Sequence, residues 1–382
     1  MIAPFAIAAP GRILFGRGES AKAPGLLRGF GPRGVLVHGT NAARAAWLAD
    51  ALVEAGCSLI TLSCPKEPDL PMLMAAVARA RDHAPDWIVA LGGGAVVDLG
   101  KAVAALVPGA GAPLKHLEVV GQGLPLDASP LPFIAIPTTS GTGAEATKNA
   151  VIGLPEHGRK VSLRDDRMLP RIAIVDPALT DNAPWGLTLA SGLDAVTQVI
   201  EPYVSCKATP FTDAVTRAAI PVGLKALASL RHQEVPEARD AMAWVSLSGG
   251  LALANAGLGA VHGLAGVIGG VSPAPHGAVC GALLGPVLRA NLRAVPHDGQ
   301  YGERLREVCG WIAGAMGGGA FDAPEVLAHW AKEAGLPGLE AQGLDPALLG
   351  EVVKASLSSS SMKGNPVPLP VEVLAEVMRQ AL

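Results

Sequence analysis

The sequence predicts an α/β domain built on a parallel sheet, followed by an all-helical domain. Up to about residue 177, short apolar strands alternate with helical stretches, which is the pattern of a parallel sheet with crossover helices. Beyond Thr180 the apolar residues recur with helical spacing almost to the end of the chain. A length of 382 residues is sufficient for two domains. We therefore expect one domain over residues 1–180 and a second over residues 181–382.

The expected strands of the first domain end in turns rich in Gly, Pro or Thr. They cover residues 12–16, 34–39, 58–64, 86–94, the beginning of 131–147, and 171–177. Between them, the sequence predicts helices over residues 41–56 and near 70–84. Lys160 is expected in a short loop before the last strand.

Composition and charge exclude several classes of partner. The chain is 50% hydrophobic and 16% charged, with a formal net charge of −3, so nothing attracts it to nucleic acid or to an acidic membrane. Its five cysteines form no CxxC pair, which is typical of free buried thiols in a reducing cytosol. The first ten residues are apolar but lack a basic leader, so we expect no signal peptide and a cytoplasmic protein.

The most unusual stretch lies in the second domain. From Ala243 to Leu288 there is no Asp, Glu, Lys or Arg. Such a run indicates either a membrane span or a buried helix pair. It is rich in Gly and Ala, contains Asn255 and His262, and is broken by a Pro-containing turn at residues 269–275. These features favour buried helices.

Two histidines in this region, His262 and His276, combine with the upstream Asp194 and Gln198 into a candidate metal site. Asp194 and Gln198 are four residues apart and would share one helix face. Imidazole and carboxylate ligands suit Zn(II) or Fe(II), and two histidines with one carboxylate leave coordination positions open for a substrate. The alternative is that His262 is a core residue bonded to a backbone carbonyl.

A glycine-rich turn follows the strand that ends near residue 92. Gly92, Gly93 and Gly94 would let the backbone approach a pyrophosphate, which the amides of the following helix N-terminus stabilise. The turn is not a GxGxxG motif, so a simple strand-to-helix turn is the alternative. Asp98 and Lys101 follow on the first turns of that helix. They could contact the cofactor or simply lie on a solvated face.

A second polar loop, residues 137–143, offers hydroxyl groups and backbone access to a ligand. Its candidate cofactor-binding residues are Thr138, Thr139 and Thr142, and Ser140 lies among them. The alternative is a loop that caps a helix at Glu145. Lys160 is a further candidate, with a solvated lysine as its alternative.

The motifs of the whole chain, taken in order, resemble those of the iron-containing (group III) alcohol dehydrogenases. The matching segments are residues 92–104, 137–147, 176–180, 191–205, 255–270, 275–277 and 364–369. The resemblance implies the dehydroquinate synthase-like architecture, in which a dinucleotide-binding domain and a helical metal-binding domain hold NAD(P) in the cleft between them. It implies that Asp194, His262 and His276 bind the metal, and that the chain forms a homodimer.

Two positions depart from the family pattern. Gln198 stands where the family normally has a histidine ligand, and its neutral amide oxygen would be a weaker fourth ligand. Gly266 stands where the family has a histidine near the nicotinamide, so its proton-relay role would pass to water, Lys160 or another group. A maleylacetate reductase-like enzyme and a metal-free dinucleotide-binding protein without catalysis are therefore the alternatives.

The expected activity is the metal-assisted, NAD(P)-dependent interconversion of a small alcohol and an aldehyde or ketone. The metal, Fe2+ or Zn2+, would polarise the substrate oxygen. After the second strand, Gly39 and Thr40 are expected to contact the cofactor, and neither they nor Asn41 carries an acidic group that would repel a 2′-phosphate. We therefore expect NADP to be accepted beside NAD. The expected catalytic residues are Asp194, His262, His276 and Lys160.

Overall fold

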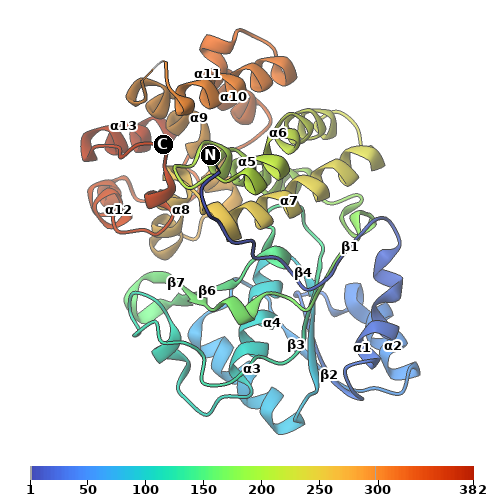
Figure 1. Cartoon of the computed structure of the whole chain (residues 1–382). Coiled ribbons are helices and arrows are strands. Elements are labelled where there is room, and N and C mark those ends of the chain that lie inside the picture. The colour runs from blue at the N-terminus through green and yellow to red at the C-terminus, as the bar shows by residue number, and fades with distance from the viewer. Residues whose placement is uncertain (1, 297) are drawn as a thin grey trace. The chain divides into compact units, whose positions relative to one another are not determined.

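The computed structural model describes residues 2–296 and 298–382, and the chain divides into two compact units. One unit comprises residues 8–139 and 144–180, and the other comprises residues 181–382 with residues 2–7 and 140–143. Figure 1 shows strands concentrated in the first unit and helices in the second. The predicted order, an α/β region followed by an all-helical region, is confirmed.

The first unit contains a six-stranded, entirely parallel sheet. Its strands are β1 (Ile13–Phe15), β2 (Arg33–His38), β3 (Ser58–Ser63), β4 (Trp87–Gly92), β5 (Phe133–Pro137) and β8 (Ile172–Val175). Their spatial order is β1-β8-β5-β4-β2-β3. Parallel neighbours need crossover connections, and the predicted helices between the strands supply them.

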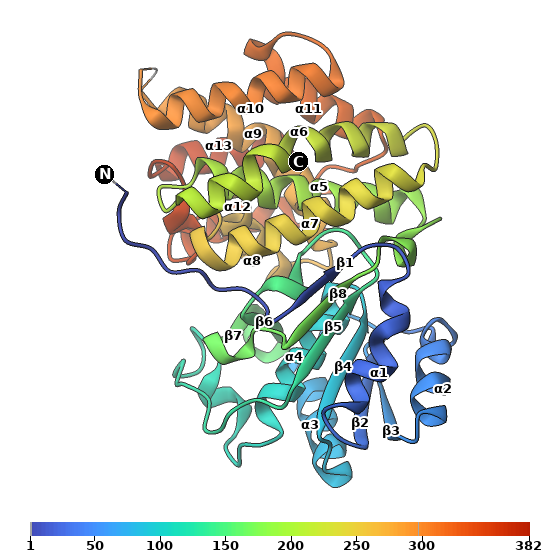
Figure 2. The ribbon, with the colours of Figure 1, turned by 45° about the vertical axis from the view of Figure 1, so that its right-hand side comes forward.

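Helices cover both faces of this sheet (Figure 2). Because side chains alternate along a strand, Ile88 and Ala90 of β4 join a core with α3 (Leu70–His83) and α4 (Gly94–Leu106). Trp87, Val89 and Leu91 point the other way and join a core with α1 (Ala23–Arg28) and α2 (Ala46–Glu54). Burial on both faces explains why these strands are continuously apolar in sequence.

Lys160 lies in an antiparallel hairpin, so its predicted position in a loop is wrong. β6 (Asn149–Leu154) pairs with β7 (Arg159–Arg164), and Lys160 lies in β7 opposite Gly153 instead of in a loop. Both strands alternate buried and more exposed residues, with Ile152 and Val161 among the buried ones. This period of two is the signal that would have predicted the hairpin.

The order of the strands reverses between β2 and β4, because β3 lies on one side of β2 while β5 and β8 lie beyond β4. In open parallel sheets, ligands bind outside the carboxyl ends of the strands at such a reversal. β2 ends just before Gly39, β4 ends at Gly92, and Gly92 is paired with Pro137 at the end of β5. Three loops singled out from the sequence therefore begin at one edge of the sheet.

The second unit is a bundle of helices. They are α5 (Trp185–Val204), α6 (Pro210–Leu230), α7 (Pro236–Ala256), α8 (Ala260–Val271), α9 (His276–Ala294), α10 (Gln300–Met316), α11 (Ala323–Glu333), α12 (Leu349–Ser356) and α13 (Val371–Ala381). The central helix, α5, packs against α6, α7 and α9. No single helix among the described residues is long and apolar enough to cross a membrane; α7 and α8 meet that criterion only as a pair bent by 97°.

Candidate functional site

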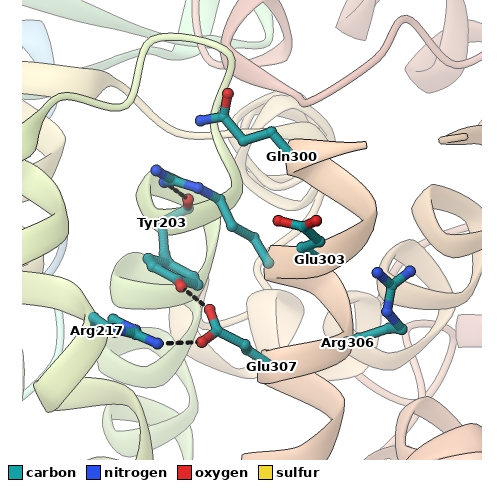
Figure 3. A pocket seen from close by; sticks show the side chains of 7 residues that line it. Tyr203, Arg217, Gln300, Glu303, Arg306 and Glu307 are labelled. Carbon is teal, nitrogen blue, oxygen red and sulfur yellow. Dashed lines mark hydrogen bonds and ion pairs between the residues drawn. The ribbon is translucent and has the colours of Figure 1, made fainter. Parts of the chain in front are cut away.

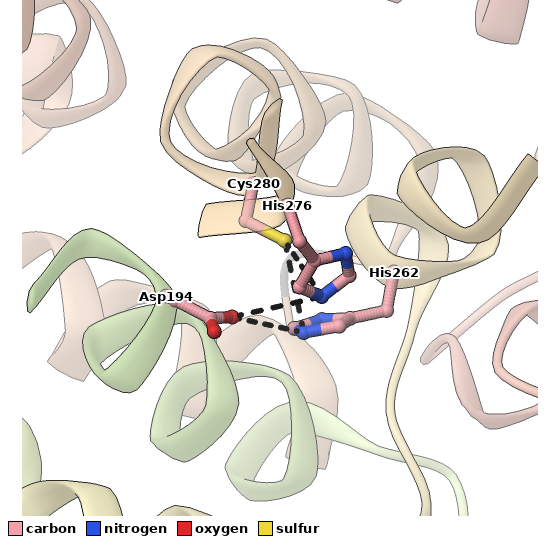
Figure 4. A group of neighbouring side chains, drawn as sticks. All are labelled: Asp194, His262, His276 and Cys280. Carbon is pink, nitrogen blue, oxygen red and sulfur yellow. Dashed lines mark hydrogen bonds and ion pairs between the residues drawn. The ribbon is translucent and has the colours of Figure 1, made fainter. Parts of the chain in front are cut away.

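Four side chains that could hold a metal ion converge inside the helical unit (Figure 4). Asp194 comes from α5, His262 from α8, and His276 and Cys280 from α9. One donor atom from each lies within 4.8 Å of all the others. Asp194 Oδ1 is 3.3 Å from His262 Nε2 and 3.9 Å from His276 Nε2. The sequence therefore singled out three members of a real spatial cluster, and the structure adds a fourth.

Glycines on α9 allow this convergence. A Cβ atom at Gly277 would lie 2.3 Å from the carbonyl oxygen of Ala190, and one at Gly281 would lie 2.6 Å from a methyl group of Leu193. Both contacts are with α5, so a larger residue at 277 would push α9 away from the α5 backbone, and one at 281 would displace the Leu193 side chain. The two glycines are four residues apart, as are His276 and Cys280, and each glycine follows one of these residues. Close packing of α9 on α5 thus brings the donor atoms towards Asp194.

A buried glutamate fixes the orientation of His262. Glu201 is only 4% exposed, and its Oε2 atom lies 2.6 Å from His262 Nδ1. Its other oxygen accepts a hydrogen bond from the backbone N–H of Val261, at the N-terminus of α8. Metal-binding histidines commonly donate their second ring N–H to a carboxylate in this way. The core-residue alternative for His262, a bond to a backbone carbonyl, is therefore not what the structure shows.

A second backbone N–H at the start of α8, that of Ala260, is bound by a residue of the motif at 364–369. Asn365 Oδ1 accepts a hydrogen bond from the backbone N–H of Ala260. The Asn365 amide in turn donates to Asn291 Oδ1 and to the carbonyl of Val367. The segment 364–369 therefore holds the first turn of the helix that carries His262.

The contact between Asp194 and His262 has room for a proton or a metal ion. A carboxylate can only accept, so the contact with Glu201 places a proton on His262 Nδ1 and leaves the lone pair of the neutral imidazole on Nε2. That lone pair faces Asp194 Oδ1, which is buried and has no hydrogen-bond partner among the described residues. Two buried acceptors at 3.3 Å need a proton or a metal ion between them. The residues present fit a divalent metal.

The electrostatics of the protein without metal agree with this interpretation. Burial tends to raise the pKa of Asp194, but His262 and His276 hold it below its usual value. The Cys280 thiolate raises the pKa of His276 to about 9. Burial opposes ionisation of Cys280, yet the two histidines lower its pKa. The metal-free cluster thus retains protons on its imidazoles, and metal binding would displace them.

Gln198 lies on the same face of α5 as Asp194 and is 2% exposed. Its side-chain N–H donates to the carbonyl of Gly141 at 2.8 Å, so its role as a metal ligand stays a prediction. A Cβ atom at Gly266 would meet nothing within 4 Å, so open space occupies the position where a histidine was expected from the resemblance.

Sequence reasoning missed Glu201 and Cys280. Glu201 follows Asp194 by seven residues, two turns along the same helix face, and this spacing was the available signal. Cys280 follows His276 by four residues, but a cysteine in an apolar helix usually serves as a small core residue.

The carboxyl edge of the sheet in the other unit has the features of a phosphate site. Gly93 is the N-cap of α4, and no side chain caps that end of the helix. A Cβ atom at Gly92 would lie 2.6 Å from Val96, which explains the requirement for glycine there. A Cβ atom at Gly93 would lie 3.3 Å from Thr139 Oγ1, and the backbone N–H of Thr138 donates to the Gly92 carbonyl. The predicted loops therefore meet around the first turn of α4.

Other predicted cofactor residues have contacts within the protein. Thr40 Oγ1 donates to the carbonyl of Pro65 at 3.3 Å, and Asp98 accepts the backbone N–H of Val151 at 3.0 Å. Lys160 forms an ion pair with Glu67. Lys101 is 1% exposed and donates to Ala144, Thr147 and Asn149, so the solvated face considered for it is wrong.

A separate polar pocket lies on the helical unit between α5, α6 and α10 (Figure 3). Three of its charged side chains are paired. Glu307 binds both the Tyr203 hydroxyl and Arg217, while Arg304 binds Asp213 and the Tyr203 carbonyl. This arrangement is a surface network that joins three helices, and the cluster around Asp194 contains none of its residues.

Comparison with known proteins identifies the family. Residues 10–177 match the iron-containing alcohol dehydrogenase family, and residues 188–382 match the C-terminal domain of Fe-containing alcohol dehydrogenases. The chain is 35% identical to the probable alcohol dehydrogenase EutG of Escherichia coli over 80% of its own length and 76% of that protein. It is 33% identical to the NAD-dependent methanol dehydrogenase of Bacillus methanolicus over 78% and 77% of the two chains.

Solved structures give the same result. A crystal structure of 1,3-propanediol oxidoreductase shares 27% identity with a TM-score of 0.88, and the match covers 100% of both chains. An iron-containing alcohol dehydrogenase from Thermococcus thioreducens shares 26% identity with a TM-score of 0.84 over 99% of both chains. These relatives are alcohol dehydrogenases and oxidoreductases, which does not favour the maleylacetate reductase or non-catalytic alternatives. The chain belongs to the iron-containing alcohol dehydrogenase family and is a metal-dependent alcohol dehydrogenase.

Proposed function

We propose that the protein interconverts a small primary or secondary alcohol and its carbonyl compound, using NAD or NADP and one divalent metal ion, iron or zinc. The observation that supports a metal most directly is the convergence of four possible donor side chains, Asp194, His262, His276 and Cys280, whose donor atoms all lie within 4.8 Å of one another. Residues 1–180 form the dinucleotide-binding domain in this proposal, and residues 181–382 form the helical domain that binds metal and substrate.

Asp194, His262 and His276 hold the metal, with Gln198 as an additional weak ligand. When bound, the metal supplies a Lewis acid for the substrate oxygen. Glu201 keeps the lone pair of His262 directed into the cluster. The side chain of His276 is 35% exposed, whereas those of Asp194 and His262 are at most 6% exposed. Substrate therefore approaches from the side of His276.

In the oxidative direction, bound NAD(P) would supply the hydride acceptor, and the protein would have to remove the proton that the substrate hydroxyl releases. No imidazole replaces the histidine expected at Gly266, where the backbone faces open space. Water at this position is our candidate proton carrier. Lys160 would have to exchange its ion pair with Glu67 for a ligand group before it could act as carrier or cofactor contact.

The cofactor lies against the carboxyl edge of the sheet in this proposal. Its pyrophosphate is placed at the uncapped N-terminus of α4, at Gly92, Gly93 and Gly94, where backbone amides and the helix dipole favour an anion. The remaining proposed contacts come from the neighbouring loops and from α4 and β7, namely Gly39, Thr40, Asp98, Thr138, Thr139, Thr142 and Lys160. Asn41 caps the short helix at 42–45, so no acidic group follows β2 to repel a 2′-phosphate.

A cytoplasmic homodimer is also part of the proposal. All five cysteines are free, which suits a reducing compartment. The apolar side chains of Ile2, Phe5 and Ile7 are 73%, 43% and 56% exposed, and such a stretch can be covered by a second copy. Light scattering of the purified protein measures its mass and tests the dimer.

The activity test uses the purified chain with short aldehydes and both reduced cofactors. Turnover should fall at least about a hundredfold after treatment with a chelator, equivalent to about 2.7 kcal/mol in the barrier, and should return when Fe(II) or Zn(II) is added. An Asp194→Asn variant should be inactive with and without added metal. Full activity in chelated protein that contains no metal would show that the mechanism does not use one.

The cofactor assignment predicts the binding of both NADH and NADPH, with dissociation constants within about a hundredfold of each other. Gly93→Val should weaken both at least about tenfold, because bulk at this position blocks the approach of backbone to pyrophosphate. Gly25→Val in α1 is the matched control, since a Cβ atom there meets nothing within 4 Å. Fluorescence titration measures the six dissociation constants, two for each of the three proteins, and equal affinities in Gly93→Val and the native protein would refute the assignment.

Glu201 is assigned as a positioning residue for His262. In Glu201→Gln the amide oxygen can accept from Val261, but its NH2 group then faces His262 Nδ1 and favours a proton on Nε2. We expect metal affinity to fall by about 10–100-fold. Glu325→Gln is the control, because Glu325 pairs with Arg289 outside the cluster. Competition with a fluorescent zinc chelator gives the affinities, and an unchanged value in Glu201→Gln would remove this role.

A further inference from the structure

Cys280 is the one member of the four-residue cluster that has no assigned role. Its side chain is fully buried, and its Sγ atom lies 3.7 Å from both His262 Nε2 and His276 Nε2. The sulfur therefore faces the same two nitrogen atoms that would bind the metal. A cysteine that only filled space in the core would not need to direct its sulfur at two imidazole nitrogens (Figure 4).

We propose that the Cys280 thiolate is the strong fourth ligand of the metal, in a site formed by one carboxylate, two imidazoles and one thiolate. This inference rests on the proposed metal-dependent function. It leaves Gln198 as the weaker additional donor.

The separations between donor atoms match this assignment. Bond lengths of about 2.0–2.3 Å to nitrogen, oxygen and sulfur place tetrahedral ligands about 3.3–3.6 Å apart. The two sulfur–nitrogen distances are 3.7 Å, and the two oxygen–nitrogen distances are 3.3 and 3.9 Å. These four separations lie within about 0.6 Å of the tetrahedral values, and the other two donor–donor separations are at most 4.8 Å.

The helix geometry explains why Cys280 reaches the site together with His276. Residues four apart on α9 lie on the same face, one turn above the other. Gly277 and Gly281 let that face of α9 approach α5 closely. The same packing that brings His276 to Asp194 therefore brings Cys280 with it.

A thiolate ligand would change the chemistry of the site. Together, Asp194 and Cys280 carry two negative charges, which neutralise a divalent ion completely. Thiolate is a soft ligand that suits Zn(II), whereas a site of imidazole and carboxylate alone suits Fe(II) and Zn(II) alike. We therefore expect the site to prefer Zn(II) over Fe(II). A neutral site would also polarise the substrate oxygen less strongly than a site that retains a positive charge.

Cobalt(II) reports directly on sulfur ligation, because a cobalt–thiolate bond produces a charge-transfer band in the near ultraviolet. The full chain, stripped with chelator and loaded with one Co(II), should show this band. Cys280→Ser should lose it while it still binds Co(II), with affinity reduced at least about tenfold. Cys309→Ser should retain the band, since Cys309 is also buried but lies outside the cluster. Gln198→Ala should retain the band and lose less affinity than Cys280→Ser.

X-ray absorption at the zinc edge of the native protein gives the same information without any variant. It should show one sulfur at about 2.3 Å beside nitrogen and oxygen ligands. Stoichiometric metal without a charge-transfer band or a sulfur neighbour would overturn the role of Cys280 and leave the proposed metal enzyme intact. A protein that binds neither Co(II) nor Zn(II) would overturn both. Selective alkylation of Cys280 in the metal-loaded protein would instead indicate a free nucleophilic thiol and count against ligation.

Discussion

The helical unit is organised around the cost of burying ionisable groups. Asp194, Glu201, His262 and Cys280 are all at most 7% exposed, in a part of the sequence where charged residues are rare. A buried charge is stable only when it is paired or bound to a metal. Glu201 meets this requirement through His262 and the start of α8. Asp194 meets it through His262 and His276, and a bound metal ion would take over this role.

Close helix packing and site chemistry depend on the same residues. The glycines of α9 allow backbone contact with α5, and Gly249 of α7 lies against Gln198 on another side of α5. Because glycines make these contacts between helices, a small displacement of a helix would move its donor atoms directly. The abundance of Gly and Ala between residues 243 and 288, which could suggest a membrane span, is explained by this close packing around a polar centre.

The sequence alone predicted the alternating strands, the change to helices after Thr180, and the separate residues Asp194, His262 and His276, because each stands out from an apolar background. It could not show that Glu201 binds His262, because that contact depends on where α8 begins. The place of Cys280 in the cluster could not be predicted for a related reason, because a buried core cysteine and a functional cysteine have the same sequence pattern. The position of Lys160 was wrong because a short hairpin was taken for a loop.

If a divalent metal balances the buried charges of the helical unit, metal binding should stabilise the folded protein, and thermal unfolding tests this most directly. A ligand that binds only the folded state at about a hundred times its dissociation constant adds about 2.7 kcal/mol to stability. Zn(II) should therefore raise the unfolding temperature of the chelated protein by several degrees. Mg(II), which prefers an all-oxygen site, should not. An unfolding temperature that neither Zn(II) nor Fe(II) changes would contradict the account.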